Sequence, residues 1–388
     1  MGIIPYGKQW IDEADEQSVL RVLRSDFLTQ GPEVSRFERE LARLTGARYC
    51  VAVSSGTAAL HLAVAALGIE KGAEGITSPI TFVASANAML YSGLVPRFAD
   101  IDPRTYNLNP AEVQKRLSKN TRLLLPVHFA GQPADMPAFQ DLARRNGCRI
   151  IEDASHAIGS CYADGDRVGS CRYSDLTVFS FHPVKTITTG EGGAITTNDP
   201  ELHARLLLLR THGITRDPEK LGENPGPWYY EMQDLGFNYR LTDLQAALGT
   251  SQLGRLERFR QRRRQLVELY NRCFEGEALL ATPYEDPRVR SCFHLYALQL
   301  DFARLGVSRA EVMQSLKARS IGTQVHYIPV HLQPYYRKVF GYAAGDFPIA
   351  EDYYAKALSL PLYPAMSDEE ASQVVEGVRE VLRHGRGA

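Results

Sequence analysis

The sequence predicts an α/β protein: a large domain built on a mostly parallel, mixed sheet with helices on both faces, followed by a smaller C-terminal α/β domain. Three observations lead to this prediction. At 388 residues the chain is longer than one ordinary domain. Hydrophobic residues make up 44% and charged residues 23%, as in globular proteins. Short apolar runs that end at turn residues alternate with segments of helical periodicity, which is typical of strands joined by helical crossovers.

The elements of the large domain follow one another in this alternating order. Residues 12–24 and 33–44 have helical periodicity, with Gly31-Pro32 as the turn between them. A β-rich run at residues 49–53 stops at Ser54-Ser55-Gly56-Thr57, before an Ala- and Leu-rich helix at residues 58–67. The remaining patterns predict a helix at residues 133–146 and strands at residues 95–101, 122–128, 148–152, 176–181 and 194–197.

The last third of the chain has a different pattern. A helix that begins at Thr242-Asp243 is predicted to continue to Tyr270. Shorter strand and helix patterns follow at residues 294–300, 309–319 and 368–382. We place the domain boundary near Arg255, inside or at the end of the long helix, so that residues 1–254 form the large domain and residues 255–388 the small one.

Composition and charge exclude several classes of protein. Lys and Arg number 44 against 45 Asp and Glu, so the net charge of −1 provides no general attraction for nucleic acid or an anionic membrane. No segment reaches the roughly 18 apolar residues of a membrane span, and the first residues lack a signal-peptide pattern. The six cysteines are widely separated and form no C-x-x-C pair. We therefore expect reduced thiols and a cytoplasmic location.

Three short segments carry residues suited to one cofactor. Lys185 follows the strand at residues 176–181 and precedes a run of Thr and Gly; burial would lower its pKa from about 10.4 and make it a nucleophilic amine. Asp153 ends the strand 32 residues earlier, at the sheet edge where ligands of open α/β folds bind. Ser55-Gly56-Thr57 at a helix start offers N–H groups to a phosphate.

Together these segments point to pyridoxal 5′-phosphate (PLP). A lysine forms its Schiff base, an aspartate keeps the pyridine nitrogen protonated, and a helix N-terminus binds the phosphate. Taken singly, each segment also fits a bland role: a surface lysine, an N-cap aspartate and a helix-capping turn. Their order and spacing favour the cofactor site.

Further motifs extend along nearly the whole chain, at residues 28–32, 55–60, 78–87, 152–157, 180–193 and 238–247. With these motifs the chain resembles the DegT/DnrJ/EryC1/StrS family of fold-type I, PLP-dependent sugar aminotransferases. Residues 181–193 and 326–336 are most similar to the members that act in pseudaminic acid synthesis. The resemblance implies a transfer of an amino group from L-glutamate to C4 of a UDP-linked 4-keto-6-deoxy-N-acetyl-altrosamine.

The resemblance also assigns residues to the cofactor. Lys185 would form the Schiff base and move the proton between the amino acid and the cofactor. Asp153 would pair with the pyridine nitrogen. The other contacts implied are a stack on the ring by Phe82, a position beside the ring or its 3-oxygen for His156, and phosphate contacts from Thr57, Ala58, Ser180 and, from a neighbouring subunit, Asn238.

Substrate contacts and assembly follow from the same resemblance. It assigns the nucleotide sugar to Tyr6, Asp26, Phe27, Leu28, Thr29, Gly56, Ser180, Asn238, His326, Tyr327, Ile328 and Pro329. Neutral donors and an aromatic ring suit a uracil, a hexose and a diphosphate. A contribution from the neighbouring subunit implies a homodimer with shared active sites. No nucleic acid, membrane or metal partner is expected.

Three other features have a second interpretation. His326 and His331 are five residues apart but lack a suitably spaced third ligand, so no metal site is predicted. The basic stretch of Arg255, Arg258, Arg260, Arg262, Arg263 and Arg264 spreads around one helix, which favours a solvated or dimer-facing surface over nucleic-acid binding. The breaker-rich residues 218–227, before Trp228-Tyr229-Tyr230, indicate a functional or mobile loop, and reaching across a dimer is one role open to it.

Other functions compete with this one. Within the family, the substrate could be another nucleotide 4-keto or 3-keto sugar, of the bacillosamine or perosamine type. Relatives that dehydrate sugars carry His in place of the lysine, so Lys185 argues against that branch. A non-catalytic regulator retaining the fold would have lost cofactor residues that are present here. A dinucleotide-binding oxidoreductase would need a G-x-G-x-x-G turn after the first strand, which residues 54–59 do not supply.

Overall fold

The computed structural model describes residues 2–385 of the chain and begins with two helices that the sequence predicted. In α1 (Glu13–Leu23) the Asp12 carboxylate caps the first turn and Asp15 bonds back to it, a capping box. In α2 (Pro32–Thr45) a proline stands in the first turn, and Gly46 ends the helix at a φ of 81°. Both helices end within two residues of the predicted bounds.

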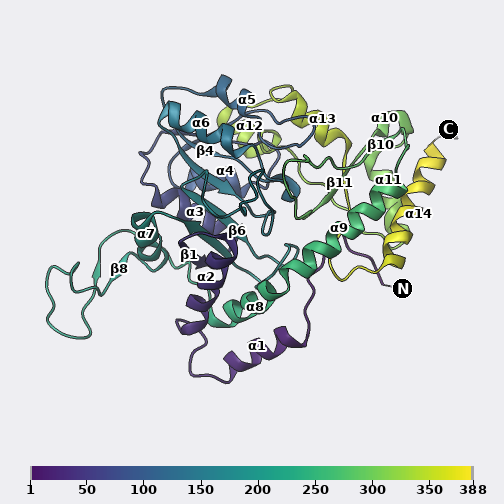
Figure 1. The fold of residues 1–388 in the computed structure, drawn as a ribbon. Helices are drawn as coiled ribbons and strands as arrows, with labels where there is room; N and C mark the ends of the chain where they lie inside the picture. The colour runs from purple at the N-terminus through teal and green to yellow at the C-terminus, as the bar shows by residue number, and fades with distance from the viewer. Residues whose placement is uncertain (1, 386–388) are drawn as a thin grey trace.

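A seven-stranded sheet forms the centre of the large domain (Figure 1). Its order is β1-β7-β6-β5-β4-β2-β3, and it is parallel except where β7 pairs with β1 and β6. This confirms the mostly parallel, mixed sheet. The strands are β1 (Tyr49–Val53), β2 (Glu74–Thr77), β3 (Val95–Phe98), β4 (Thr121–Leu125), β5 (Arg149–Asp153), β6 (Leu176–Ser180) and β7 (Gly193–Thr197). Only β2 was missed, because Glu-Gly-Ile-Thr contains no apolar run.

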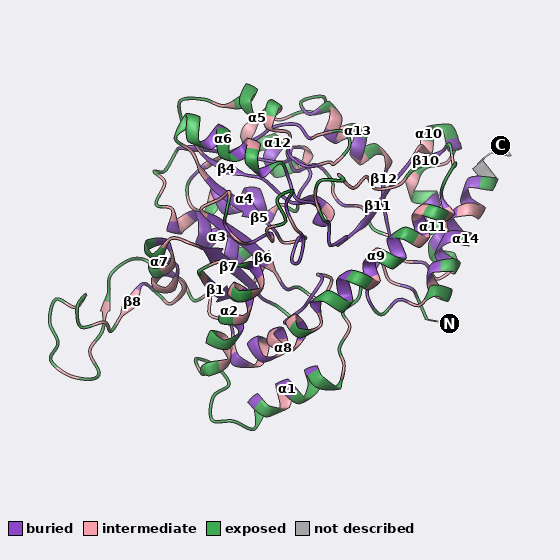
Figure 2. Ribbon diagram, in the orientation of Figure 1, coloured by how far each residue is buried: buried purple, intermediate pink, exposed green. Residues whose placement is uncertain are grey.

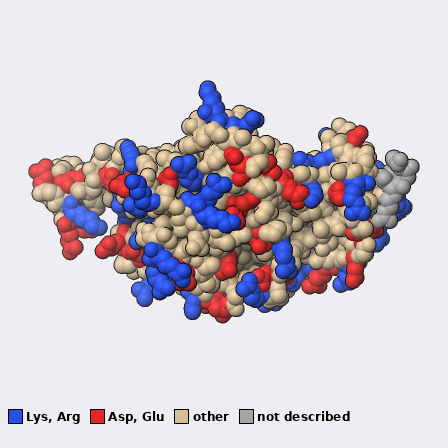
Figure 3. All heavy atoms as spheres, turned by 90° about the horizontal axis from the view of Figure 1, so that it is seen from above, with Lys and Arg blue, Asp and Glu red and all other residues tan. Residues whose placement is uncertain are grey.

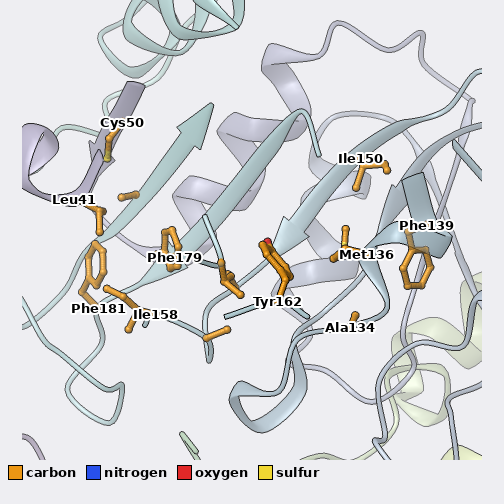
Figure 4. Packing of buried hydrophobic residues seen from close by; sticks show 14 of the residues in the cluster. Leu41, Cys50, Ala134, Met136, Phe139, Ile150, Ile158, Tyr162, Phe179 and Phe181 are labelled. Atoms are coloured by element: carbon orange, nitrogen blue, oxygen red, sulfur yellow. The ribbon is translucent and has the colours of Figure 1, made fainter. Parts of the chain in front are cut away.

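Hydrophobic packing covers both faces of this sheet. In β1, Cys50 and Ala52 belong to one core cluster while Val51 and Val53 belong to another, as the period of two in a strand requires. The first cluster packs under α2, α5 (Pro110–Arg116) and α6 (Met136–Asn146), and Figure 4 shows part of it. The second packs under α3 (Gly56–Ala66), α4 (Ala84–Tyr91) and α7 (Pro200–Arg210).

The C-terminal part is a smaller α/β unit around the antiparallel sheet β10-β11-β12. Its core cluster includes residues from Leu266 to Leu382 and also Ile4, which pairs with Ile321. A further cluster joins residues of both parts, so the two are packed together. The domain boundary near Arg255 stays a prediction. The elements are β10 (Leu280–Ala281), β11 (Tyr296–Leu300), β12 (Ala357–Leu360), α10 (Phe302–Leu305), α11 (Arg309–Ala318), α12 (Pro334–Phe340), α13 (Pro348–Lys356) and α14 (Asp368–Gly385).

The long helix predicted from Thr242 to Tyr270 is in fact two helices. It divides into α8 (Asp243–Gly254) and α9 (Leu256–Cys273) at Arg255, whose φ and ψ of −108° and 2° interrupt the helix. The Arg255 guanidinium binds Asp12, Asp15 and the carbonyl of Trp10, contacts that fix it against the start of the chain. The helix thus ends where Arg255 contacts residues about 240 positions earlier in the chain, and the hydrophobic periodicity of the sequence does not reveal such a contact.

Arg260 and Arg263 are buried, which contradicts the expectation of a solvated or dimer-facing stretch at these two positions, and for the other arginines it stays a prediction. Arg255, Arg260, Arg262 and Arg264 form ion pairs with carboxylates. Arg258 lies over the Trp10 ring, 4.5 Å from its centroid. Charges of both signs are interspersed on the face seen in Figure 3. In residues 2–385, no helix is long and apolar enough to cross a membrane.

An exposed arm leaves the large domain at the short hairpin of β8 (Ile214–Thr215) and β9 (Glu231–Met232). It projects at the left of Figures 1 and 2 and contains the predicted breaker-rich loop. Trp228 is 68% exposed and Tyr230 51% exposed.

Candidate active site

A cavity of about 580 Å³ opens at the carboxyl ends of β5 and β6, where open α/β sheets bind ligands. We call it the Lys185 cavity. The strands bring to it Asp153, the last residue of β5, and Ser180, the last residue of β6. The C-terminal part adds His294 and residues 324–328. The cavity therefore lies between the two parts of the chain.

Lys185 lies in the turn that follows β6. Its backbone N–H donates to the His182 carbonyl at 2.8 Å, and the Thr188 hydroxyl and Thr189 N–H donate to the Phe181 carbonyl, which fixes the turn. Burial lowers the pKa of the Lys185 ammonium to about 8, although the nearby Asp153 carboxylate opposes this shift. The amine is thus partly unprotonated near neutral pH, the state that a nucleophile needs.

Asp153 is 4% exposed and is held by short hydrogen bonds. Its Oδ2 accepts from the Ser85 hydroxyl at 2.7 Å, and Oδ1 accepts from the Ser155 N–H at 3.0 Å. Its backbone N–H donates to the Pro126 carbonyl, and its carbonyl accepts from the His128 N–H. The carboxylate therefore has a fixed place at the end of β5.

The neighbouring Glu152 lies on the opposite face of β5, where it anchors the same strand end. Its carboxylate accepts from His128 Nε2 at 2.8 Å and from the hydroxyls of Tyr162, Ser174 and Thr177. Although burial opposes its charge, these hydrogen bonds lower the pKa of Glu152. Of these two adjacent acidic residues, Glu152 therefore anchors the end of β5 and Asp153 lines the cavity.

The start of α3 forms another wall of the Lys185 cavity. Ser55 caps the helix, its hydroxyl accepting from the Ala58 N–H at 3.0 Å, while Gly56 and Thr57 line the cavity. A Cβ at Gly56 would lie 2.7 Å from that of Ser180, so only glycine allows this approach of the helix to β6. The N-terminus of α3, with the Thr57 and Ser180 hydroxyls beside it in the cavity, suits a phosphate.

The remaining predicted side chains form the outer walls. Phe82, Tyr6, His326 and Ile328 all line the cavity, and the Phe82 ring is 58% exposed. His156 is buried, and Tyr327 donates to or accepts from its Nε2 at 3.0 Å. Burial lowers the pKa of His326 to about 3, with Lys185 adding to the shift, so this imidazole is neutral.

Some predicted residues do not line this cavity. Ala58 and Pro329 are both buried, and neither of them lines the cavity. Residues 26–29 lie elsewhere, where the Leu28 carbonyl accepts from the Asp243 N–H and Thr29 bridges to Thr242. Asn238 belongs to the same chain segment as Asp243 and bridges to Thr211. Neither residues 26–29 nor Asn238 therefore lines the chain's own cavity.

The cavity also contains residues that the sequence reasoning missed, above all Ser85 and His294. Ser85 is part of the matched motif at residues 78–87, but nothing in its local pattern connects it with Asp153, 68 residues later. His294 ends up beside His156, with ring centroids 4.4 Å apart. These contacts depend on how the segments pack.

The two histidines considered as metal ligands are used separately. His326 Nδ1 bonds to the Ser359 hydroxyl, and His331 Nε2 bonds to Glu351. In residues 2–385, no three His, Cys, Asp or Glu side chains are grouped as metal ligands would be.

The cavity fits PLP. It combines an amine of lowered pKa, a buried carboxylate fixed by hydrogen bonds, an exposed aromatic ring and a helix N-terminus that a glycine leaves accessible. The amine suits the aldehyde of the cofactor, and the carboxylate suits its pyridine nitrogen. The aromatic ring suits the face of the pyridine ring, and the helix N-terminus suits the phosphate.

Comparisons with known proteins agree with this chemistry. The model of the DegT/DnrJ/EryC1/StrS aminotransferase family matches residues 9–379. The spore coat polysaccharide biosynthesis protein SpsC of Bacillus subtilis is 42% identical over 381 residues, 98% of this chain and 97% of that protein.

Solved structures are similar over nearly the whole chain. PseC of Helicobacter pylori, an aminotransferase involved in the biosynthesis of pseudaminic acid, has a TM-score of 0.91 and 31% identity, covering 98% of this chain and 99% of that one. The PLP form of the sugar aminotransferase Spr1654 from Streptococcus pneumoniae has a TM-score of 0.90 and 29% identity, covering 99% of both chains. With the family motifs and the Lys185 cavity in place, the chain belongs to the DegT/DnrJ/EryC1/StrS family and is a PLP-dependent nucleotide-sugar aminotransferase of fold type I.

Proposed function

We propose that this enzyme moves the amino group of L-glutamate to C4 of a UDP-linked 4-keto-6-deoxy-N-acetylhexosamine. The product would be UDP-4-amino-4,6-dideoxy-N-acetyl-β-L-altrosamine, on the pathway to pseudaminic acid. The aminotransfer rests on one observation, the meeting of Lys185 and Asp153 in one cavity at the strand ends. The choice of sugar is supported by the likeness to PseC, which extends over 98% of this chain.

Each cavity residue has a task in this reaction. PLP, when bound, supplies a conjugated ring that delocalises the electron pair left at the reacting carbon. Lys185 would hold the cofactor covalently and, as a free amine, take and return the proton at that carbon. Asp153 would bind the pyridine nitrogen, and Thr57 and Ser180 would hold the phosphate. Phe82 would cover the ring face.

The sugar would bind in the outer part of the cavity. Tyr6 and His326 lie there with their ring centroids 5.4 Å apart, next to Ile328. Because burial and Lys185 hold the pKa of His326 at about 3, this side is neutral and offers hydrogen bonds and ring faces instead of charge. Such a wall suits a hexose and a uracil.

The functional unit would be a homodimer with shared active sites. Residues 26–29 and Asn238, assigned to substrate and phosphate, are not among the residues that line the chain's own cavity. Phe27 and Leu28 are 55% and 49% exposed. A second copy that covers this surface would bury the Phe27 and Leu28 side chains and receive these residues at its cavity.

We keep the expectation of a cytoplasmic location as part of the proposal. All six cysteines are free thiols, and three of them are buried. Thiols without disulfides are typical of a reducing compartment.

A second candidate keeps the reaction and changes the sugar. SpsC, a spore coat polysaccharide biosynthesis protein, is 42% identical to this chain, compared with 31% for PseC. An aminotransferase for a different nucleotide 4-keto or 3-keto sugar is therefore the alternative, because pocket shape decides which ketone is accepted. Membership of the aminotransferase family leaves no ground for the dinucleotide-binding oxidoreductase.

A visible absorption titration of the purified protein with PLP tests the proposal. L-glutamate should bleach the band of the bound cofactor, and the UDP-linked 4-keto-6-deoxy-N-acetyl-altrosamine should restore it. Recovery with another nucleotide ketone, and not with this one, would move the enzyme to a different pathway. If glutamate leaves the band of the PLP-loaded protein unchanged, glutamate is not the donor.

A further inference from the structure

His156 is held by residues of the C-terminal part of the chain. Its imidazole is 5% exposed, and its Nε2 lies 3.0 Å from the Tyr327 hydroxyl. The two rings are nearly parallel, at 21° with centroids 6.0 Å apart. Nδ1 of His156 is buried and has no hydrogen-bond partner within residues 2–385. The bond to Tyr327 is thus the one polar contact that orients this imidazole among the described residues.

His294 supports the same imidazole by packing. Its ring centroid lies 4.4 Å from that of His156, tilted by 42°. The backbone of His294 is fixed, because its N–H donates to the Ala130 carbonyl and its carbonyl accepts from Arg263 at 3.1 Å. Arg263 is 1% exposed and also donates to the Leu362 carbonyl at 2.8 Å. A buried guanidinium therefore holds the segment behind His156 in place.

The charges around the pair keep both partners neutral. Burial, with Lys185 and His326 adding to it, lowers the pKa of His156 well below its usual range. Burial raises the pKa of the Tyr327 phenol, and Asp153 adds to that shift. His294 is likewise neutral, because burial and the neighbouring His156 and Lys185 lower its pKa. Neither partner of the hydrogen bond therefore ionises near neutral pH.

We propose that Tyr327 is a positioning residue, whose hydroxyl fixes the orientation of the His156 imidazole beside the cofactor ring while His294 supports it from within the protein. This inference rests on the proposed place of His156 at that ring. It gives Tyr327 a task different from the sugar contact that the sequence suggested. The hydroxyl makes this contact with His156 within the protein itself, at 3.0 Å.

The arrangement has a physical reason. A histidine ring has two nitrogens and turns readily about its terminal side-chain torsion, so a single directional bond is needed to select one orientation. Without the Tyr327 hydroxyl, both nitrogens of the buried His156 ring would lack a hydrogen-bond partner. The ring would then rotate to an orientation in which one nitrogen forms a hydrogen bond. The contact of His156 with the cofactor would then change even with no sugar bound.

The test is Tyr327→Phe, measured on the PLP-loaded enzyme without sugar. We expect the absorption of the bound cofactor, titrated with pH, to shift its midpoint by about half a unit or more, the scale of one lost hydrogen bond. We also expect kcat to fall about tenfold while KM for the nucleotide sugar changes less than about twofold. Tyr336→Phe is the matched control, because it removes a buried tyrosine hydroxyl bond, 2.7 Å to Asn87, away from the cavity.

Two results would overturn the proposal. One is a Tyr327→Phe spectrum identical to that of the wild type, with only KM for the sugar raised, which would make Tyr327 a sugar contact. The other is an equal spectral shift in Tyr336→Phe. The variant His294→Ala should shift the spectrum. The variant His294→Phe, which keeps a ring against His156, should shift it less. If the wild-type protein shows no cofactor band, the cofactor site itself fails, which is a separate outcome.

Discussion

At the residue scale, the lysine proposed to carry the chemistry has a lowered pKa. Lys185 has a pKa of about 8 because burial disfavours its charge, while Asp153 favours the charge and limits the shift. The pair is thus coupled before any ligand binds.

The first prediction concerns this amine in the cofactor-free protein. The rate at which Lys185 reacts with an aldehyde reagent should rise with pH to a midpoint near 8, because only the unprotonated amine reacts. In Asp153→Asn the midpoint should move to lower pH, since a favourable charge is lost. Mass spectrometry of the modified peptide measures both. A midpoint near about 10.4, the value of a solvated lysine, would contradict the lowered pKa.

A second prediction concerns Ser85, whose hydroxyl donates to Asp153 at 2.7 Å. Ser85→Ala should weaken PLP binding about tenfold, because a hydrogen bond to a carboxylate contributes about 1.5–3 kcal/mol. Fluorescence or absorption titration with PLP gives the dissociation constant. Ser92→Ala is the control, since the Ser92 hydroxyl is buried and has no partner within residues 2–385. Equal affinities for the two variants would show that Ser85 does not position Asp153.

At the element scale, the site is made by the way strand ends and helix starts meet. The period of two in β5 sends Asp153 toward α4, which brings Ser85, and sends Glu152 to the opposite face. Thr57 and Ser180 share the cavity because α3 begins against the end of β6.

A third prediction follows from that close approach. In Gly56→Ala the new methyl would lie 2.7 Å from Ser180 Cβ, so the start of α3 must move away from β6. We expect at least tenfold weaker PLP binding and a free energy of unfolding lower by about 1–3 kcal/mol, as in other overpacked sites. Urea denaturation measures the stability. Gly254→Ala, at a helix end with open space around it, should change stability by less than about 1 kcal/mol.

At the scale of the whole molecule, two sets of residues with one assigned task lie apart. The residues that line the Lys185 cavity are the ones proposed to bind the cofactor, whereas residues 26–29 and Asn238, proposed to bind substrate and phosphate, do not line it. The exposed arm with Trp228 and Tyr230 is a further apolar surface. A second copy of the chain would explain the position of residues 26–29 and Asn238 and the exposure of the arm. Enzyme activity in mixtures of variants tests this assembly.

The fourth prediction is complementation between inactive subunits. Lys185→Ala and Asn238→Ala homodimers should each be inactive or strongly impaired. If Asn238 serves the partner's site, unfolding and refolding an equal mixture should restore roughly a quarter of the wild-type activity, because half of the dimers are mixed and each carries one intact site. No recovery in a mixture shown to contain mixed dimers would place Asn238 in its own chain's site.

The sequence by itself determined the local features of this protein. Apolar runs and turn residues predicted six of the seven strands of the main sheet, and the order of Ser55-Gly56-Thr57, Asp153 and Lys185 predicted the PLP site. These signals are local because each depends on periodicity or on a residue at a strand end. The family resemblance then extended them to the reaction.

Only the tertiary structure decided the contacts between distant segments. The break at Arg255, the bond of Ser85 to Asp153 and the pairing of His156 with Tyr327 join residues 68 to 243 positions apart. No periodicity encodes such contacts, because they depend on where packed elements bring side chains together. The pKa of Lys185 belongs here as well, since the burial that lowers it exists only in the folded chain.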